Sequence, residues 1–177
     1  MPLLFTYRTA AELAGVDDTP ADYGDILEAA FASGQVDMAD LELRRDPVLL
    51  SCLLDKARQA GVKILLSLHD FRGTPPVAGM IEDFLEMERR GADMAKLAVT
   101  PRCPEDVLAL LAAAQQGVTA LGIPLAAMSM GQLGMITRLG GGVFGSSMTF
   151  GAAKKQSAPG QPPVNALKEA LDMLYGD

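Results

Sequence analysis

Histidine and cysteine are scarce in this chain, and their scarcity excludes several kinds of site. His69 is the only histidine, so a metal centre built on several histidines is excluded, and we expect neither a metal nor another cofactor. The two cysteines, Cys52 and Cys103, lie far apart in the sequence, which argues against a disulfide framework and against a cysteine-rich metal site. This cysteine usage favours a reducing, cytoplasmic compartment.

Long apolar runs and basic clusters are missing as well. The longest uninterrupted apolar run, Val107 to Ala114, is too short to cross a bilayer, and no basic segment precedes an apolar stretch at the N-terminus. The net charge is −7, and Lys and Arg never cluster beyond a pair, so the surface that would neutralise phosphates is absent. We therefore expect a soluble protein that is not secreted and that binds neither a membrane nor nucleic acid.

The 177 residues, 49% of them apolar and 21% charged, are typical of one globular domain over residues 1–177. Apolar segments alternate along the chain with helical patterns. Six strands are predicted: Leu3–Arg8, Met38–Leu43, Lys63–Asp70, Met94–Val99, Pro124–Met130 and Val143–Phe150. Helices are predicted between most of them: Tyr23 to Gly34, Val48 to Ala60 after the cap Asp46-Pro47, Thr74-Pro75 to Gly91, and onward from Pro104.

Polar residues gather on one face of the predicted strands. The residues on this face, mostly toward the carboxyl ends of the strands, are Arg8, Asp40, Glu42, His69 and Lys96. An open doubly wound sheet would be apolar on both faces. The pattern instead predicts an α/β fold, a TIM-barrel-like parallel (β/α) barrel whose mouth carries an active site. The predicted strand starts, from residue 3 to residue 143, span 140 positions in five intervals, or 28 residues per unit, so the 177 residues hold about six strand–helix units rather than eight.

Lys96 is a single charge in the middle of the apolar segment Met94–Val99. Because lysine is rarely buried alone, its amine is either paired with an acid or pushed toward its neutral form. A neutral amine attacks carbonyl groups and forms Schiff bases. The alternative is a strand-end lysine that reaches solvent or pairs with Glu42. The local sequence leaves both interpretations open.

His69 ends a hydrophobic strand and shares a face with Lys96 on the next strand. A lone histidine is usually structural, but an imidazole beside an amine that forms an iminium is a natural proton shuttle. Glu12 and Glu42 are candidates to orient it. The small, polar segment from Lys154 to Gln161 is typical of a lid or a long loop.

Several motifs follow one another in a recognisable order: Leu3–Arg8, Asp40–Leu43, Ser67–Phe71 with Thr74-Pro75, Ala95–Val99, Met128–Met130, Arg138-Leu139, Val143–Ser146, Thr149–Gly151 and Ser157–Gln161. Across essentially the whole chain they resemble the type I 3-dehydroquinate dehydratases, the Schiff-base lyases of the shikimate pathway of aromatic amino acid biosynthesis. This resemblance names a substrate, 3-dehydroquinate, which the residues alone do not.

The resemblance also implies roles for individual residues. Lys96 would form the Schiff base with the substrate ketone, His69 would move protons, and Glu12 would orient His69. Arg138 would bind the substrate carboxylate together with Ser157 and Gln161 from the lid, and Arg8 would bind ring hydroxyls. Met130 and Phe150, which lie in the matching motifs, complete the predicted substrate-binding set.

The chain also departs from the family pattern. It begins at what looks like the third strand of the family's eight-stranded barrel, so the first two strand–helix units have no counterpart. The second of these units normally brings a Glu and an Arg to the substrate, so we expect reduced efficiency. Because a barrel with open edges invites association, we expect a homodimer, with closure of six strands in a monomer as the alternative.

Two other functions remain open at this point. One is a different class I aldolase-type Schiff-base lyase, which would share Lys96 but not the sequence Ser157–Gln161. The other is a catalytically weak or silent remnant that binds a shikimate-type ligand or a partner subunit.

Overall fold

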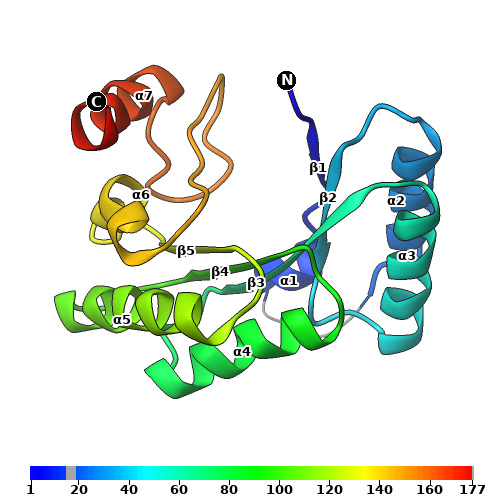
Figure 1. Cartoon of the computed structure of the whole chain (residues 1–177), viewed down its shortest axis with the longest axis horizontal. Helices are drawn as coiled ribbons and strands as arrows, with labels where there is room; N and C mark the ends of the chain where they lie inside the picture. Colours follow the sequence, from blue (N-terminus) through cyan, green and yellow to red (C-terminus); the bar gives the residue numbers. More distant parts are fainter. Residues whose placement is uncertain (15–18, 177) are drawn as a thin grey trace.

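Five parallel strands form one sheet in the computed structural model, which describes residues 1–14 and 19–176 (Figure 1). The strands pair in sequence order, β1-β2-β3-β4-β5, and each neighbouring pair is parallel. Their bounds are β1 (Leu4–Thr6), β2 (Met38–Glu42), β3 (Lys63–Asp70), β4 (Met94–Val99) and β5 (Leu125–Ser129). The predicted parallel α/β architecture is therefore confirmed.

Helices connect the strands as expected for right-handed crossovers. Their bounds are α1 (Ala10–Ala14), α2 (Tyr23–Ala32), α3 (Pro47–Gln59), α4 (Val77–Arg89), α5 (Pro104–Ala120), α6 (Met135–Gly140), the 3₁₀ helix η1 (Gly141–Phe144) and α7 (Val164–Tyr175). At the start of α3 the Asp46 side chain accepts a hydrogen bond from the Leu49 backbone N–H, the cap that the sequence predicts. Helix α4 begins at Val77, later than predicted, because Pro76 holds an extended backbone that cannot start the helix.

The strand predicted over Val143–Phe150 is wrong. The chain there begins in η1, and Gly145 then turns with a φ of 92°, a left-handed conformation that glycine adopts readily. A single β-bridge, between Leu125 and Ser146, and a hydrogen bond from the Ala127 backbone N–H to the Ser146 hydroxyl join this segment to β5. Within the described residues the sheet thus has five strands where the sequence predicted six, and β1 and β5 do not pair to close it.

The two faces of the sheet differ in the way that the alternation predicts. Helices α2 to α5 pack against one face, where the main core includes Leu41, Leu66 and Leu97 (Figure 1). The other face carries a smaller apolar cluster with Leu65 and Met128. Buried polar residues on this second face are Asp40, Glu42, Ser67 and Lys96. The apolar core therefore holds the strands in place, and the opposite face can present polar side chains to a ligand.

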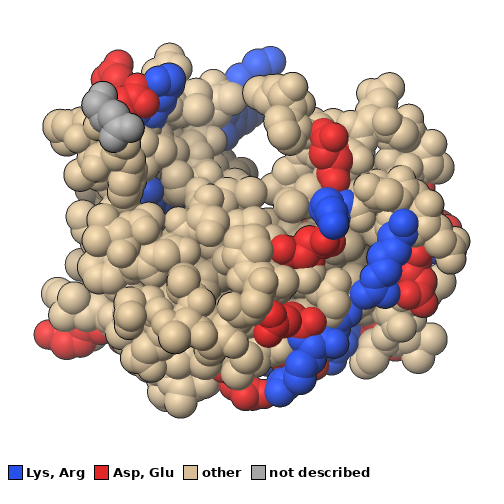
Figure 2. Space-filling view, viewed as in Figure 1, with Lys and Arg blue, Asp and Glu red and all other residues tan. Residues whose placement is uncertain are grey.

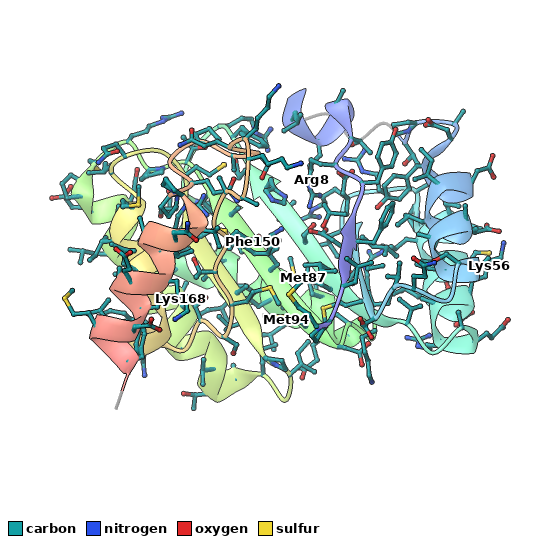
Figure 3. The ribbon with its side chains drawn as sticks, turned by 90° about the horizontal axis from the view of Figure 1, so that it is seen from above. Arg8, Lys56, Met87, Met94, Phe150 and Lys168 are labelled. Atoms are coloured by element: carbon teal, nitrogen blue, oxygen red, sulfur yellow. The ribbon has the colours of Figure 1, made fainter. Side chains whose placement is uncertain are left out.

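The second face is covered only in part. Figure 3 looks down on it and shows Arg8 and Phe150 above the strands, with Lys56 far to the side on α3. Figure 2 shows the molecule hollowed between the part that carries α7 and the part that carries β1. On the right of Figure 2, basic side chains lie beside acidic ones. On α3, Arg58 pairs with Asp55. Across the described part of the chain, we find no helix with the length and apolar character that a bilayer span requires.

Candidate active site

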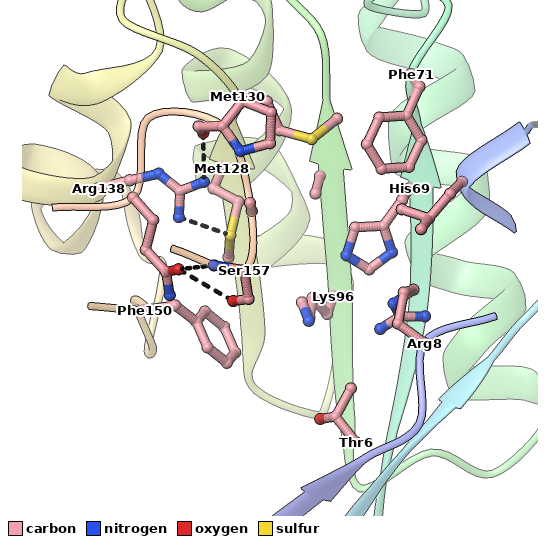
Figure 4. Close-up of a pocket in the computed structure, with 15 residues that line it drawn as sticks. Thr6, Arg8, His69, Phe71, Lys96, Met128, Met130, Arg138, Phe150 and Ser157 are labelled. Atoms are coloured by element: carbon pink, nitrogen blue, oxygen red, sulfur yellow. Dashed lines mark hydrogen bonds between the residues drawn. The ribbon is translucent and has the colours of Figure 1, made fainter. Parts of the chain in front are cut away.

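A cavity of about 340 Å³ opens over the carboxyl ends of the strands. Its lining includes eight of the nine residues that the sequence predicts for the site: Arg8, His69, Lys96, Met130, Arg138, Phe150, Ser157 and Gln161 (Figure 4). The ninth, Glu12, contacts His69 from outside this lining. Strands β3, β4 and β5 supply the floor, and the segment after η1 supplies one wall. The structure thus gathers side chains that are up to 153 positions apart in sequence, Arg8 and Gln161.

Lys96 lies at the centre of the cavity floor with only 5% of its surface exposed. Its Nζ atom donates a hydrogen bond to Oδ2 of Asp40 at 2.9 Å and lies 4.5 Å from the centre of the Phe150 ring. The sequence left open whether this amine is paired. In the structure it is paired, and its partner is Asp40 rather than Glu42. The amine also faces the cavity.

His69 lies beside Lys96 on the neighbouring strand. Its Nδ1 atom is 3.1 Å from Oε2 of Glu12, and Oε1 of Glu12 accepts a hydrogen bond from the His69 backbone N–H. Burial lowers the pKa of His69, although the Glu12 carboxylate opposes this shift. The imidazole is therefore suited to accept a proton near neutral pH.

Of the two carboxylates considered as partners of His69, only Glu12 contacts it. Glu42 instead accepts hydrogen bonds from the backbone N–H and the hydroxyl of Thr9, and it pairs with Arg45. Burial raises the pKa of Glu12, but its close contact with His69 and the charge of Arg8 outweigh this and hold the pKa below its usual value. Glu12 is therefore an anion that can stabilise a protonated His69.

Arg8 binds three carboxylates at once. Its Nη1 atom donates to Glu12 and Glu42, and its Nη2 atom donates to Asp40 at 2.8 Å. Its side chain keeps 17% of its surface exposed, toward the cavity. Both protons of Nη1 are thus used within the protein, and only Nη2 and Nε retain capacity for a ligand hydroxyl.

Arg138 is buried without an acidic partner among the described residues. It is 2% exposed, its Nη1 atom lies 3.5 Å from the Met128 sulfur, and its Nη2 atom donates to the Pro159 carbonyl at 3.5 Å. Its Nε atom has no hydrogen-bond partner in the described structure. Burial lowers the pKa of Arg138. A buried guanidinium that lacks a counter-ion and lines a cavity is suited to bind a carboxylate or phosphate there.

The segment Ser157–Gln161 forms the wall opposite His69 (Figure 4). The Gln161 side-chain oxygen accepts hydrogen bonds from both the backbone N–H and the hydroxyl of Ser157. The Pro159 carbonyl accepts a hydrogen bond from the backbone N–H of Gly131. These contacts hold polar side chains from the predicted lid next to Arg138.

Sequence reasoning did not identify Asp40 as a site residue. The sequence does place Asp40 on the same polar strand face as Lys96. The two residues are not on neighbouring strands, however, because β3 lies between β2 and β4. Met128, whose sulfur lies 3.5 Å from Arg138 Nη1, is a further residue of the cavity lining outside the predicted set. No group of three or more potential metal-binding side chains occurs within residues 1–14 and 19–176.

Comparisons with known proteins point to one family. The family described as type I 3-dehydroquinase matches residues 1–177. A 3-dehydroquinate dehydratase of Listeria monocytogenes is 41% identical over 174 residues, which cover 98% of this chain and 69% of that protein. The crystal structure of 3-dehydroquinate dehydratase from Geobacillus kaustophilus superposes with a TM-score of 0.91 at 39% identity and covers 99% of this chain and 69% of that one.

A further solved relative carries a ligand. It is the type I 3-dehydroquinate dehydratase of Clostridium difficile with covalent modified comenic acid, with a TM-score of 0.89 and 36% identity. The match covers 98% of this chain and 68% of that one. These relatives extend the agreement from the sequence to the three-dimensional fold.

Proposed function

We propose, since the chain belongs to the type I 3-dehydroquinase family, that it is a carbon–oxygen lyase that dehydrates 3-dehydroquinate to 3-dehydroshikimate through a Schiff base on Lys96. The observation that carries this proposal is the buried amine of Lys96, which faces the cavity within reach of His69. Such an amine forms an imine with a ketone, and the resulting iminium acidifies the neighbouring C–H bond.

His69 is the proposed base. It removes the proton from C2 next to the iminium, and it returns a proton to the C1 hydroxyl as that group leaves. Glu12 holds the ring and stabilises the imidazolium that forms in between. Removal of the C2 proton and protonation of the C1 hydroxyl thus use the same imidazole, that of His69, beside the Lys96 amine.

Arg138 is the proposed binding group for the substrate carboxylate. Its lack of an acidic partner in the described structure, its burial and its place in the cavity lining support this role. Ser157 and Gln161 are neutral hydrogen-bonding groups beside it. Arg8 is proposed to contact ring hydroxyls through its remaining donors, with Met130 and Phe150 as apolar walls.

Borohydride reduction in the presence of 3-dehydroquinate tests this function directly. We expect mass spectrometry to find the reduced adduct on Lys96, and we expect absorbance to show the conjugated enone of 3-dehydroshikimate accumulating. Lys96→Ala should form neither. Lys63→Ala serves as a matched control, because Lys63 is exposed and pairs with Asp93 away from the cavity.

The alternatives give different results in the same experiment. Another Schiff-base lyase would form the adduct without producing the enone. A silent remnant would form no adduct at all, and either result would contradict the proposed activity.

The proposal extends to assembly and compartment. In the described structure β1 and β5 each have one edge without a paired strand, apart from the single bridge at Leu125. Open edges favour association with another chain, so we propose a homodimer. Cys52 and Cys103 are both free thiols, which supports a reducing, cytoplasmic location.

A further inference from the structure

Asp40 lies beneath the cavity floor, where it touches two cations of the site, Arg8 and Lys96. It is fully buried on β2. A single oxygen, Oδ2, accepts hydrogen bonds from Lys96 Nζ at 2.9 Å and from Arg8 Nη2 at 2.8 Å. The other oxygen, Oδ1, accepts a hydrogen bond from the Ser67 hydroxyl at 2.6 Å. Every oxygen of this carboxylate is therefore occupied, and two of its three partners are positively charged.

We infer that Asp40 is a positioning residue for the Schiff base, which holds the Lys96 nitrogen in place and remains its counter-ion when the ammonium becomes an iminium. This inference rests on the proposed function. It assigns to Asp40 a role in the reaction although its side chain lies outside the cavity lining.

The surroundings of Lys96 support this assignment. Asp40 contacts the amine from one side, and the ring of Phe150 lies 4.5 Å from it. The amine thus has a carboxylate and an aromatic face as neighbours, both of which attract a cation. A long, flexible lysine side chain would otherwise sample many rotamers.

The charge balance of the site also depends on Asp40. Ion pairs link three carboxylates to three cations: Glu12, Asp40 and Glu42 with Arg8, Arg45 and Lys96. Removing the charge of Asp40 would leave one positive charge in excess, with Arg8 and Lys96 close together and no anion between them. In a buried site such an unbalanced charge is costly.

Asp40 remains ionised while the Lys96 ammonium becomes an iminium. Burial raises the pKa of its carboxyl, but the positive charges of Lys96 and Arg8 and the hydrogen bond from Ser67 hold it well below its usual range. Asp40 is thus unsuited to take a proton from the amine, and its role is electrostatic.

The covalent step balances without a proton on Asp40. His69 takes one proton from the Lys96 ammonium, the freed nitrogen lone pair bonds to the ketone carbon, and the ketone oxygen leaves as water with that proton and a second one from the nitrogen. One proton stays on the nitrogen, which is positively charged before and after the step. The Asp40 carboxylate therefore has a positively charged partner both before and after the step, and its side chain needs no rearrangement.

Asp40→Asn, an isosteric change that removes the charge, tests the inference, with Asp83→Asn as the matched control. Asp83 is a carboxylate with 16% of its side chain exposed; it pairs with Arg44 and contributes nothing to the lining of the Lys96 cavity. The rate of borohydride trapping on Lys96 with 3-dehydroquinate, kcat, KM and the melting temperature would be measured for each protein. We expect Asp40→Asn to lower the trapping rate and kcat by about 10²-fold, with KM changed less than about threefold. The control should trap at the parent rate.

The outcomes separate this inference from the proposed function. If the parent protein forms no adduct, the proposed function fails and this inference fails with it. If the parent and Asp40→Asn form the adduct at the same rate per folded molecule, only the inference is overturned. A lowered melting temperature with an unchanged trapping rate also overturns it, because that result marks a purely structural carboxylate.

Ser67→Ala decides the question if Asp40→Asn does not fold. This change removes the hydrogen bond to Oδ1, with a longer one of 3.5 Å to the Leu41 carbonyl, and leaves both ion pairs of Asp40. A trapping rate reduced by a few fold, with unchanged KM, supports the positioning role of Asp40. A trapping rate equal to that of the parent contradicts it.

Discussion

Glu12 fixes His69 at two points: its Oε2 lies 3.1 Å from the ring Nδ1, and its Oε1 accepts a hydrogen bond from the His69 backbone N–H. One carboxylate therefore sets both the ring orientation and the position of the main chain. Because Nδ1 faces Glu12, Nε2 is the nitrogen left for proton transfer in the cavity. The orientation of a base by a carboxylate is a recurring device in catalysis.

The first prediction concerns pH. Burial lowers the pKa of His69 below its ordinary value of 6.5, and Glu12 opposes this shift, so the neutral, proton-accepting form predominates at pH 7. We expect kcat/KM, which reports on the free enzyme, to fall on the acid side with a midpoint below 6.5. Glu12→Gln removes the charge that favours the imidazolium, so this midpoint should move to still lower pH. An acid limb centred above pH 6.5 would contradict the assignment.

Replacement of the base itself gives a second prediction. His69→Ala should lower kcat by about 10² to 10⁴-fold, the usual contribution of a positioned general base. Lys96 would still form the imine, so borohydride should still trap the substrate, although more slowly. Turnover as fast as that of the parent would show that His69 is structural.

The sequence predicts the buried strands most accurately. The predicted ranges Lys63–Asp70 and Met94–Val99 coincide with β3 and β4, because both strands lie between two neighbours and bury their alternating faces. The segment over 143–150 also has apolar and β-branched residues, yet it does not form a strand. The backbone turns at Gly145, which has a left-handed conformation. The amino-acid composition does not reveal such a turn.

The site residues follow from the pattern only in part. Alternation places Lys96 and His69 on one face, and it does so because both strands keep a strict period of two. It does not tell which carboxylate meets the amine. That contact depends on the register of β2, β3 and β4, in which Ser67 is paired with both Glu42 and Lys96. Asp40 reaches Lys96 diagonally across this register, so only the assembled sheet identifies it.

The third prediction concerns the positive charge of the buried Arg138 side chain. Arg138→Met removes a buried guanidinium without an acidic partner in the described structure, so the melting temperature should be unchanged or higher. The same change should raise KM about 10- to 100-fold, because a charge-assisted hydrogen bond to a carboxylate contributes about 1.5 to 3 kcal/mol. Thermal unfolding and steady-state kinetics measure the two effects.

Arg58→Met is the control for Arg138→Met. Arg58 is exposed and pairs with Asp55 on α3, so neither KM nor kcat should change. An Arg138→Met protein with the parent KM would show that the substrate carboxylate binds elsewhere.

The fourth prediction concerns the wall formed by Ser157–Gln161. Its internal hydrogen bonds join Ser157 to Gln161, but the segment consists of small and polar residues with little apolar surface to bury. We expect fast amide hydrogen exchange there in the free protein and slower exchange when a carboxylate-bearing ligand is bound. Exchange that is equally slow with and without ligand would contradict a lid.

The last prediction concerns the open edges of the sheet. Strand β1 is short and pairs on one side only within the described structure, and unpaired backbone groups at such an edge favour pairing with a second chain. Light scattering should therefore give twice the monomer mass of 18.6 kDa. Leu4→Lys places a charge on the edge strand and should shift the equilibrium toward monomers, whereas Val48→Lys, at an exposed position on α3, should not. A particle of 18.6 kDa at every concentration would refute the dimer and would mean that this edge is tolerated in water.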